Sequence, residues 1–275
     1  MFVQSKETID IQNVTISYEY YRANKPDADT LVFIHGFLSC SFSFRKLFPL
    51  LYTDFNLLCF DLPGFGESEK ISSIHYSLHE YASLANDLLE RFNIEKAILI
   101  GHSMGGQIAL RTCIQHPERV KKLILLCSSS YIKSSSLPLR LCSYLPFFPF
   151  CLSIGMSSIN IQKNFQHLVY DHKLLTQEVI DGYTTSFSEK GFYNALAKLV
   201  REREEDLSTS TLNKINFPIL LIWGEDDRLV PLRVGERMKK DLPDAELLVF
   251  PHTGHLISEE HPDKTADAIR SFLAK

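Results

Sequence analysis

The sequence predicts an α/β protein with a mostly parallel central sheet and helices on both faces. Short, mostly apolar runs typical of strands lie at residues 97–100, 218–224 and 245–250, and the run at 218–224 is typical of a buried strand. Segments 76–92 and 263–273 carry apolar residues at helical spacing, which predicts helices that pack on a sheet. Strands that alternate with helices form parallel sheets covered on both faces, because each connection crosses back over the sheet.

The N-terminal part of the chain predicts the start of this sheet. Residues 8–11 and 14–21 flank a two-residue turn, and apolar or aromatic residues alternate along the second run, as in an antiparallel hairpin. Apolar runs at 30–34 and 56–61 predict two further strands. The alternation of strand and helix then continues to the C-terminus, apart from residues 131–207.

Length, composition and charge are those of a single α/β unit. The chain has 275 residues, a length that one large sheet with its helices commonly reaches. Its hydrophobic content of 45% can fill a buried core. The net charge is −4, and no stretch is rich in arginine or lysine, so we expect no nucleic-acid partner.

Cysteine usage and the N-terminus predict a cytoplasmic protein. Residues 1–7 lack the apolar core of a signal peptide. Several cysteines lie in apolar runs and none forms a paired framework, so we expect reduced core residues. The sequence has neither a glycine-rich phosphate loop nor metal-ligand spacing, which predicts a protein without cofactor or metal. The six cysteines are Cys40, Cys59, Cys113, Cys127, Cys142 and Cys151.

The most informative motif is Gly101-His102-Ser103-Met104-Gly105, which stands between a predicted strand and a predicted helix. A turn this sharp holds its central residue in a strained backbone conformation and points the side chain outward. The neighbouring glycines avoid a collision with the surrounding backbone. This context predicts a nucleophile elbow with Ser103 as the nucleophile.

Residues that could activate this serine follow in the chain. A serine hydroxyl needs a histidine base and an orienting carboxylate to act as a nucleophile near neutral pH. Asp226 and Asp227 follow one C-terminal strand, and either could supply the carboxylate. His252 and His255 follow the next strand, and either could supply the base. Serine, aspartate and histidine therefore occur in this order, each on a loop after a strand.

With these residues in this order, the chain resembles the α/β-hydrolase fold family, in its serine carboxylesterase and monoacylglycerol lipase branch. The resemblance extends over nearly the whole length. It implies a mostly parallel sheet with helices on both faces and an inserted helical cap. The family pattern Gly-x-x-Asp-x-x-x-Pro falls on Gly224, Asp227 and Pro231, which favours Asp227 as the acid. The pair Gly254-His255 favours His255 as the base.

The loop His35-Gly36-Phe37 resembles the oxyanion loop of the family. The resemblance implies that the backbone N–H groups of Phe37 and Met104 receive the negative oxygen of a tetrahedral intermediate. We assign His35, Gly36 and His102 to the substrate-binding surroundings. For both histidine rings, a structural hydrogen bond is the favoured role.

Residues 131–207 interrupt the alternation of strand and helix where the family inserts a mostly helical cap over the active site. The predicted α/β-hydrolase core is therefore residues 1–130 and 208–275. Within the cap, residues 189–206 are predicted to form a helix with a charged, solvated end at 201–206.

The most apolar stretch of the chain is residues 137–152, at the start of the predicted cap. Three prolines and Arg140 argue against a membrane-spanning helix, which needs about 20 continuous apolar residues. We interpret the stretch as an apolar wall over the substrate, with Phe147 and Phe148 as substrate contacts. Packing on the core is one alternative. Contact with a lipid surface is a second, weaker one, since the expected charged opposite face is weak.

The motifs predict a serine hydrolase that cleaves carboxylic esters with apolar groups through an acyl-enzyme intermediate. Haloalkane dehalogenases and epoxide hydrolases carry an aspartate at the nucleophile position, so Ser103 excludes them. Carbon–carbon bond hydrolases, acyltransferases and perhydrolases share the scaffold and remain alternatives, as does a non-catalytic protein that binds a small molecule. Leu256 disfavours the carbon–carbon hydrolases, which tend to carry a tryptophan after the catalytic histidine.

Overall fold

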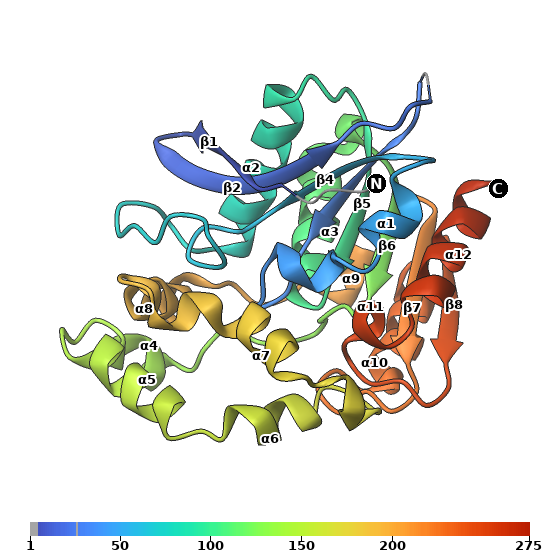
Figure 1. Cartoon of the computed structure of the whole chain (residues 1–275). Coiled ribbons are helices and arrows are strands. Elements are labelled where there is room, and N and C mark those ends of the chain that lie inside the picture. Colours follow the sequence, from blue (N-terminus) through green and yellow to red (C-terminus); the bar gives the residue numbers. More distant parts are fainter. Residues whose placement is uncertain (1–4, 26) are drawn as a thin grey trace.

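A computed structural model describes residues 5–25 and 27–275. The strands found there are β1 (Glu7–Ile11), β2 (Val14–Tyr21), β3 (Thr30–Ile34), β4 (Asn56–Phe60), β5 (Ala97–His102), β6 (Val120–Leu126), β7 (Ile219–Gly224) and β8 (Ala245–Phe250). They form one eight-stranded sheet in the order β1-β2-β4-β3-β5-β6-β7-β8 (Figure 1). β2 pairs antiparallel with β1 and β4, and the remaining pairs are parallel. The predicted α/β-hydrolase fold, with its mostly parallel sheet, is confirmed.

Most of the central strands are buried along their whole length. Every residue of β3, β5 and β7 is buried, as expected for a parallel sheet covered on both faces. The edge strand β8 instead alternates between exposed and less exposed positions. The continuous apolar runs in the sequence therefore mark the middle of the sheet.

Helices lie on both sides of the sheet (Figure 1). α2 shows why such helices form: Ser77 caps its start by accepting a hydrogen bond from the Glu80 N–H. Leu78, Tyr81 and Leu88 then bury one face of α2 in the core. The helices of the core are α1 (Phe48–Leu51), α2 (Leu78–Arg91), α3 (Met104–Gln115), α9 (Thr209–Leu212), α10 (Leu232–Asp241), α11 (Ile257–Glu260) and α12 (Pro262–Leu273).

The regular structure between β6 and β7 is helical, with no strand among these residues. We call residues 131–207 the cap; its limits as a separate unit remain a prediction. The cap helices lie together beyond one end of the sheet (Figure 1). They are α4 (Leu137–Cys142), α5 (Phe148–Ser157), α6 (Ile161–Gln166), α7 (Gln177–Thr184) and α8 (Phe192–Glu202).

The position of the apolar stretch at residues 137–152 differs from the two favoured interpretations, which are a wall over the substrate and packing on the core. α4 and α5 contact α8, and α8 packs on the core through Phe192 and Leu199. α4 and α5 therefore lie outside α8, and neither contains a buried residue. The prediction that this stretch forms a wall over the substrate or packs on the core is wrong for most of its surface. Cys142 and Cys151 are exposed for the same reason, contrary to the predicted core position.

The charged run at residues 201–206 contacts the start of α2 instead of pointing freely into solvent. The Glu202 carboxylate accepts a hydrogen bond from the Tyr76 N–H at 2.7 Å. The Glu204 carboxylate accepts one from the Leu78 N–H, also at 2.7 Å. The first N–H groups of a helix have no partner within that helix, so nearby carboxylates stabilise them. The prediction of a merely solvated helix end is corrected by these contacts.

No helix in the described part of the chain is both long and apolar enough to cross a membrane. Residues 1–4, part of the N-terminal segment that predicted the absence of a signal peptide, lie outside the described residues. The cytoplasmic location stays a prediction.

Candidate active site

The predicted nucleophile elbow is present at Ser103. This residue stands between the end of β5 and the start of α3, with φ of 53° and ψ of −118°. A positive φ is rare and costly for a residue with a side chain, so the surrounding structure must hold it in place. The Ser103 N–H donates to the Leu126 carbonyl at 3.0 Å, which ties the turn to the end of β6. The strand, the strained turn and the helix occur in the predicted order.

Two glycines let the backbone pass close to its neighbours at this turn. A Cβ atom on Gly101 would lie 2.4 Å from the Gly105 carbonyl oxygen. A Cβ atom on Gly105 would lie 2.1 Å from the carbonyl oxygen of Ile34 in β3. The elbow glycines are therefore required by the packing of α3 against two strands.

We predict that Gly105→Ala lowers the free energy of unfolding by about 3 kcal/mol or more, because the new methyl group collides with backbone that cannot move away. Gly155→Ala is the matched control, since a Cβ atom at Gly155 in α5 would meet nothing within 4 Å. In a helix this control should stabilise by roughly 0.5–1 kcal/mol. Urea unfolding followed by circular dichroism measures both, and equal stabilities for the two variants would contradict the packing argument.

The structure brings together the favoured acid and the favoured base. The His255 Nδ1 lies 2.7 Å from Asp227 Oδ2. The other carboxylate oxygen, Oδ1, accepts hydrogen bonds from the N–H groups of Leu229 and Val230 at 2.9 and 2.8 Å. His252 is exposed and instead places its ring against Tyr170. Asp227 and His255 are therefore the pair that the geometry selects.

Asp227 is held in its ionised form. Burial raises the pKa of this carboxyl, but the hydrogen bond and charge of His255 and the N–H of Val230 lower it, and the net shift is downward. An ionised Asp227 accepts the Nδ1–H of His255 and fixes the imidazole tautomer. The other ring nitrogen, Nε2, is then the one that can take a proton from a hydroxyl.

Ser103 and His255 line one cavity of about 450 Å³. No hydrogen bond joins the Ser103 hydroxyl to the imidazole, although both residues belong to the described part of the chain. Such contacts are often long in a site without substrate and shorten when substrate binds. The lining residues are Gly36, Phe37, Leu38, Ser39, His102, Ser103, Met156, Ile159, Ile161, Asn164, Phe165, His167, Leu168, Tyr183, Phe187, Leu229, His255 and Leu256.

The predicted oxyanion loop runs beside the elbow. A Cβ atom on Gly36 would lie 3.0 Å from the Cβ of Ser103, so the two turns nearly touch. His35 holds the loop from behind: its Nδ1–H donates to the Gly36 carbonyl at 2.8 Å, and its Nε2 accepts from the Leu62 N–H at 2.9 Å. Burial lowers the pKa of His35, which keeps the ring in this neutral form. His35 therefore positions the loop and does not face the cavity.

His102 lines the cavity, but its ring supports the base. Its Nε2–H donates to the backbone carbonyl of His255 at 2.9 Å, and the two ring centroids lie 4.7 Å apart. Burial, together with the charge of His255, lowers the pKa of His102 to about 3. The ring is thus neutral at physiological pH. The structural role that the sequence favoured for the rings of His35 and His102 matches these contacts.

The buried His102 predicts a specific pH dependence of stability. Between pH 6.5, its ordinary pKa, and about pH 3, the unfolded chain binds a proton at this ring and the folded chain does not. Stability should therefore fall as the pH falls, by about 1.4 kcal/mol per pH unit for this group. His102→Asn should make the slope of unfolding free energy between pH 6 and pH 4 shallower by that amount. Parallel curves for the two proteins, measured by urea unfolding at each pH, would overturn the assignment.

Two further contacts hold the loop of His255, and the sequence alone did not indicate them. The carbonyl of Leu168 in the cap accepts hydrogen bonds from the N–H groups of His255 and Leu256 at 2.7 and 3.2 Å. Glu260 accepts one from the Gly254 N–H at 2.7 Å and also binds backbone N–H groups of the cap. A backbone carbonyl has no sequence signature. Glu260 follows the candidate base closely, but its role depends on where the cap lies.

Phe147 and Phe148 do not line the cavity at Ser103, which corrects the prediction that they contact substrate. Phe147 caps the start of α5 on the outer side of the cap and is exposed. The apolar wall of the cavity comes instead from the end of α5 and the start of α6, through Met156, Ile159 and Ile161. The sequence located the apolar stretch, but not which of its turns would face inward.

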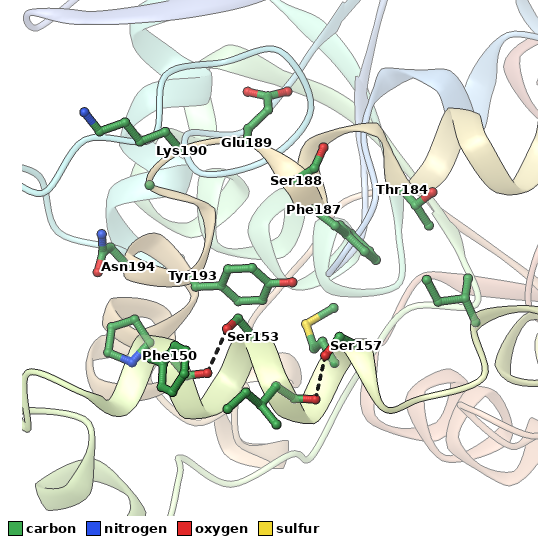
Figure 2. Close-up of a pocket in the computed structure, with 15 residues that line it drawn as sticks. Phe150, Ser153, Ser157, Thr184, Phe187, Ser188, Glu189, Lys190, Tyr193 and Asn194 are labelled. Carbon is green, nitrogen blue, oxygen red and sulfur yellow. Dashed lines mark hydrogen bonds between the residues drawn. The ribbon is translucent and has the colours of Figure 1, made fainter.

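A second hollow, of about 720 Å³, adjoins the cavity at Ser103. The two share Met156, Ile161 and Phe187 as lining residues. Figure 2 shows the second hollow between α5 and the segment that leads into α8. The hydroxyls of Ser153 and Ser157 there donate back to carbonyls of their own helix. Apolar surface therefore continues from the cavity at Ser103 toward the outside of the cap.

A sequence model of the alpha/beta hydrolase fold matches residues 29–149 and 142–262, and so covers most of the chain. The chain belongs to this family. It is 40% identical over 263 residues, 96% of either chain, to "Uncharacterized hydrolase YugF" of Bacillus subtilis (strain 168). It is 32% identical over 237 residues, 84% of this chain and 81% of the relative, to a 2-hydroxy-6-oxononadienedioate/2-hydroxy-6-oxononatrienedioate hydrolase of a Pseudomonas species. A solved thermophilic esterase from Thermogutta terrifontis has the same fold, with a TM-score of 0.79 and 22% identity over 99% of this chain and 98% of that one.

One group of donor atoms in this α/β hydrolase has a spacing that a metal ion could use. Cys127 offers a sulfur that lies within 4.8 Å of donor atoms of Asp227 and His255. Burial, reinforced by the charge of Asp227, raises the pKa of the Cys127 thiol well above its usual range. A metal binds the thiolate, which this environment disfavours. The cluster therefore suits a hydrogen-bonded acid–base pair better than a metal ion.

Proposed function

We propose that this α/β hydrolase is a serine hydrolase that cleaves carboxylic esters with apolar groups through an acyl-enzyme intermediate. One observation carries the proposal: Ser103 and His255, whose imidazole is bound by Asp227, open onto a single, mostly apolar cavity. An apolar cavity excludes water from one part of the substrate and leaves the ester carbonyl beside the nucleophile.

The proposed reaction has two halves, formation of the acyl-enzyme and its hydrolysis, and both use the same residues of the site. The Ser103 hydroxyl gives its proton to His255 Nε2 as its oxygen bonds to the ester carbonyl carbon. The backbone N–H groups of Phe37 and Met104 stabilise the resulting oxyanion, and one such donor is typically worth about 3 kcal/mol. Met104 is the first residue of α3, so its N–H has no acceptor within the helix. The imidazolium then protonates the departing alkoxide. Water next releases the acid by the same two steps, with His255 taking and returning its proton.

The charge of the cavity supports a neutral ester over a carboxylate-bearing substrate. The Pseudomonas relative is named for a nonadienedioate, a substrate with two carboxylates. A carboxylate buried in a protein needs a cation or several hydrogen-bond donors as partners. Among the described residues that line the cavity there is no lysine and no arginine. Ser39, Asn164, His167 and Tyr183 are the polar side chains that line it besides Ser103, His255 and His102.

Carbon–carbon bond hydrolysis is the second candidate, because the 32% identity to that relative extends over 84% of this chain. The reaction uses the same serine scaffold, so the triad does not separate the two activities. Acyltransferases and perhydrolases differ from an esterase only in the acceptor that competes with water, and a binding protein would retain its ligand unchanged.

The test compares p-nitrophenyl esters from acetyl to long acyl chains with a 2-hydroxy-6-oxodienoate under the same conditions. We expect kcat/KM to rise with acyl length until the cavity is full, and to exceed that for the dienoate by at least about tenfold, the factor for 1.4 kcal/mol. Each buried CH₂ contributes about 0.8 kcal/mol. A dienoate preferred over every ester would instead establish the carbon–carbon hydrolase, and tight binding without product would establish a binding protein.

A further inference from the structure

The outer face of the cap is an apolar surface that no other part of the described chain covers. Most of the exposed large hydrophobic side chains among residues 5–25 and 27–275 lie between residues 137 and 161. Leu141 in α4 and Phe150 in α5 are 60% and 66% exposed. Other exposed members of this surface are Leu137, Leu139, Tyr144, Leu145, Phe147 and Ile154. Contiguous apolar patches of this kind are unusual on a monomer and mark a contact surface. We call residues 137–161 the apolar face.

The charge of the segment that carries the apolar face is opposite in sign to that of the whole protein. The chain contains 33 Asp and Glu and has a net charge of −4. None of these acids lies between residues 131 and 170, where Lys133, Arg140 and Lys163 are exposed. A segment with apolar and basic residues but no acidic ones is complementary to a surface that is apolar inside and negatively charged outside.

The apolar face continues into the catalytic cavity. Ile159 and Ile161 are exposed and also line that cavity, so they belong to both. Phe37 and Leu229, on core loops, are exposed side chains that line the same cavity. A substrate that reaches the apolar face from a lipid layer would therefore meet side chains that also line the cavity of Ser103.

We propose that the apolar face docks on an anionic lipid surface, so that the catalytic cavity opens toward the lipid. A second copy of the chain suits this face less well. In a two-fold dimer the same patch meets itself, which would bring Arg140 and its basic neighbours against the same positive charges. The docking is peripheral, and it does not depend on whether an ester is the substrate.

The test is flotation of the full-length protein with vesicles of phosphatidylcholine and phosphatidylglycerol in equal amounts, and with vesicles of phosphatidylcholine alone. We expect binding to the mixed vesicles that weakens with added salt, because each basic residue near an anionic surface strengthens binding roughly fivefold. Leu141→Ser combined with Phe150→Ser should reduce the bound fraction at least about tenfold, since two apolar side chains no longer enter the interface. Lys133→Glu combined with Lys163→Glu should abolish the preference for the mixed vesicles.

Ile114→Ser is the matched control, because Ile114 is also an exposed apolar residue but lies in α3, outside the cap. It should float like the unchanged protein. All variants should give the circular dichroism spectrum and the urea midpoint of the unchanged protein, which shows that they are folded. The proposal would be overturned if the unchanged protein did not float with the mixed vesicles. It would also be overturned if Leu141→Ser/Phe150→Ser floated as well as the unchanged protein. Sedimentation velocity without vesicles gives the remaining outcome: a dimer lost in Leu141→Ser/Phe150→Ser, together with no flotation, would assign the face to a second copy.

Discussion

Ser103→Ala is expected to lower kcat/KM for a p-nitrophenyl ester by about 10⁴-fold or more, because the change removes the hydroxyl that forms the acyl-enzyme. The elbow itself should survive the change. Alanine has the same Cβ as serine, and the contacts that hold the turn are made by the backbone N–H and carbonyl of residue 103. The measurement is initial-rate kinetics, with circular dichroism to show that the fold is retained.

Ser129→Ala provides the control for this experiment. The Ser129 hydroxyl is buried, and the described part of the chain offers it no hydrogen-bond partner. The N–H of Ser129 donates to the Ser103 carbonyl at 3.0 Å, and this contact does not involve the hydroxyl. Removal of an unsatisfied hydroxyl is nearly neutral, so turnover should stay within about twofold. If Ser103→Ala retained a comparable rate, the hydroxyl at 103 would not be the nucleophile.

Asp227→Asn is expected to lower kcat/KM by about 10³- to 10⁴-fold while the fold is kept. The amide has only one accepting oxygen, so it cannot accept both the Nδ1–H of His255 and the N–H groups of Leu229 and Val230 as the two carboxylate oxygens do. The imidazole can then take the wrong tautomer. The amide also carries no charge to stabilise the imidazolium that forms when Ser103 loses its proton. The rate of ester hydrolysis as a function of pH measures both effects.

Asp226→Asn is the matched control at the neighbouring position, since the sequence left both aspartates open. Its rate should stay within about twofold of the unchanged protein, because Asp226 contributes its backbone N–H to the loop, at 2.9 Å from the Thr253 carbonyl. A larger loss in Asp226→Asn than in Asp227→Asn would reverse the assignment.

A second-site test is also available at Cys127. This residue directly follows β6 with φ of 42°, and its sulfur lies near donor atoms of Asp227 and His255. Aspartate tolerates such a φ, so Cys127→Asp should restore part of the rate of ester hydrolysis that Asp227→Asn loses.

The parts of the molecule that follow from short-range patterns were predictable from the sequence. The strand at 30–34 has the predicted bounds, because its continuous apolar run fits only a strand that is buried on both faces. The strand at 245–250 also has the predicted bounds, although it lies at the edge of the sheet. The elbow was predictable because only glycine fits at positions 101 and 105. The structure also places Asp227 and His255 together, as expected when neighbouring parallel strands end at the same edge of a sheet.

The parts that depend on long-range packing were not predictable in the same way. Phe147 is as apolar as Met156, yet it faces outward because α5 packs on α8 with its other side. The Leu168 carbonyl that holds His255 is a backbone group, which any residue could supply. The role of Glu204 at the start of α2 required the position of α8 relative to the core. In each case the chemistry of one residue did not identify its partner.

The most direct test of the central claim is to treat the protein with a fluorophosphonate and to locate the label by peptide mass spectrometry. A serine activated by His255 should react within minutes, and the label should lie on the peptide that contains Ser103. Asp227→Asn should slow the labelling by a factor similar to its effect on turnover, while Asp226→Asn should not. A protein that remains unlabelled, or that is labelled at another residue, would contradict the assignment of Ser103 as the nucleophile.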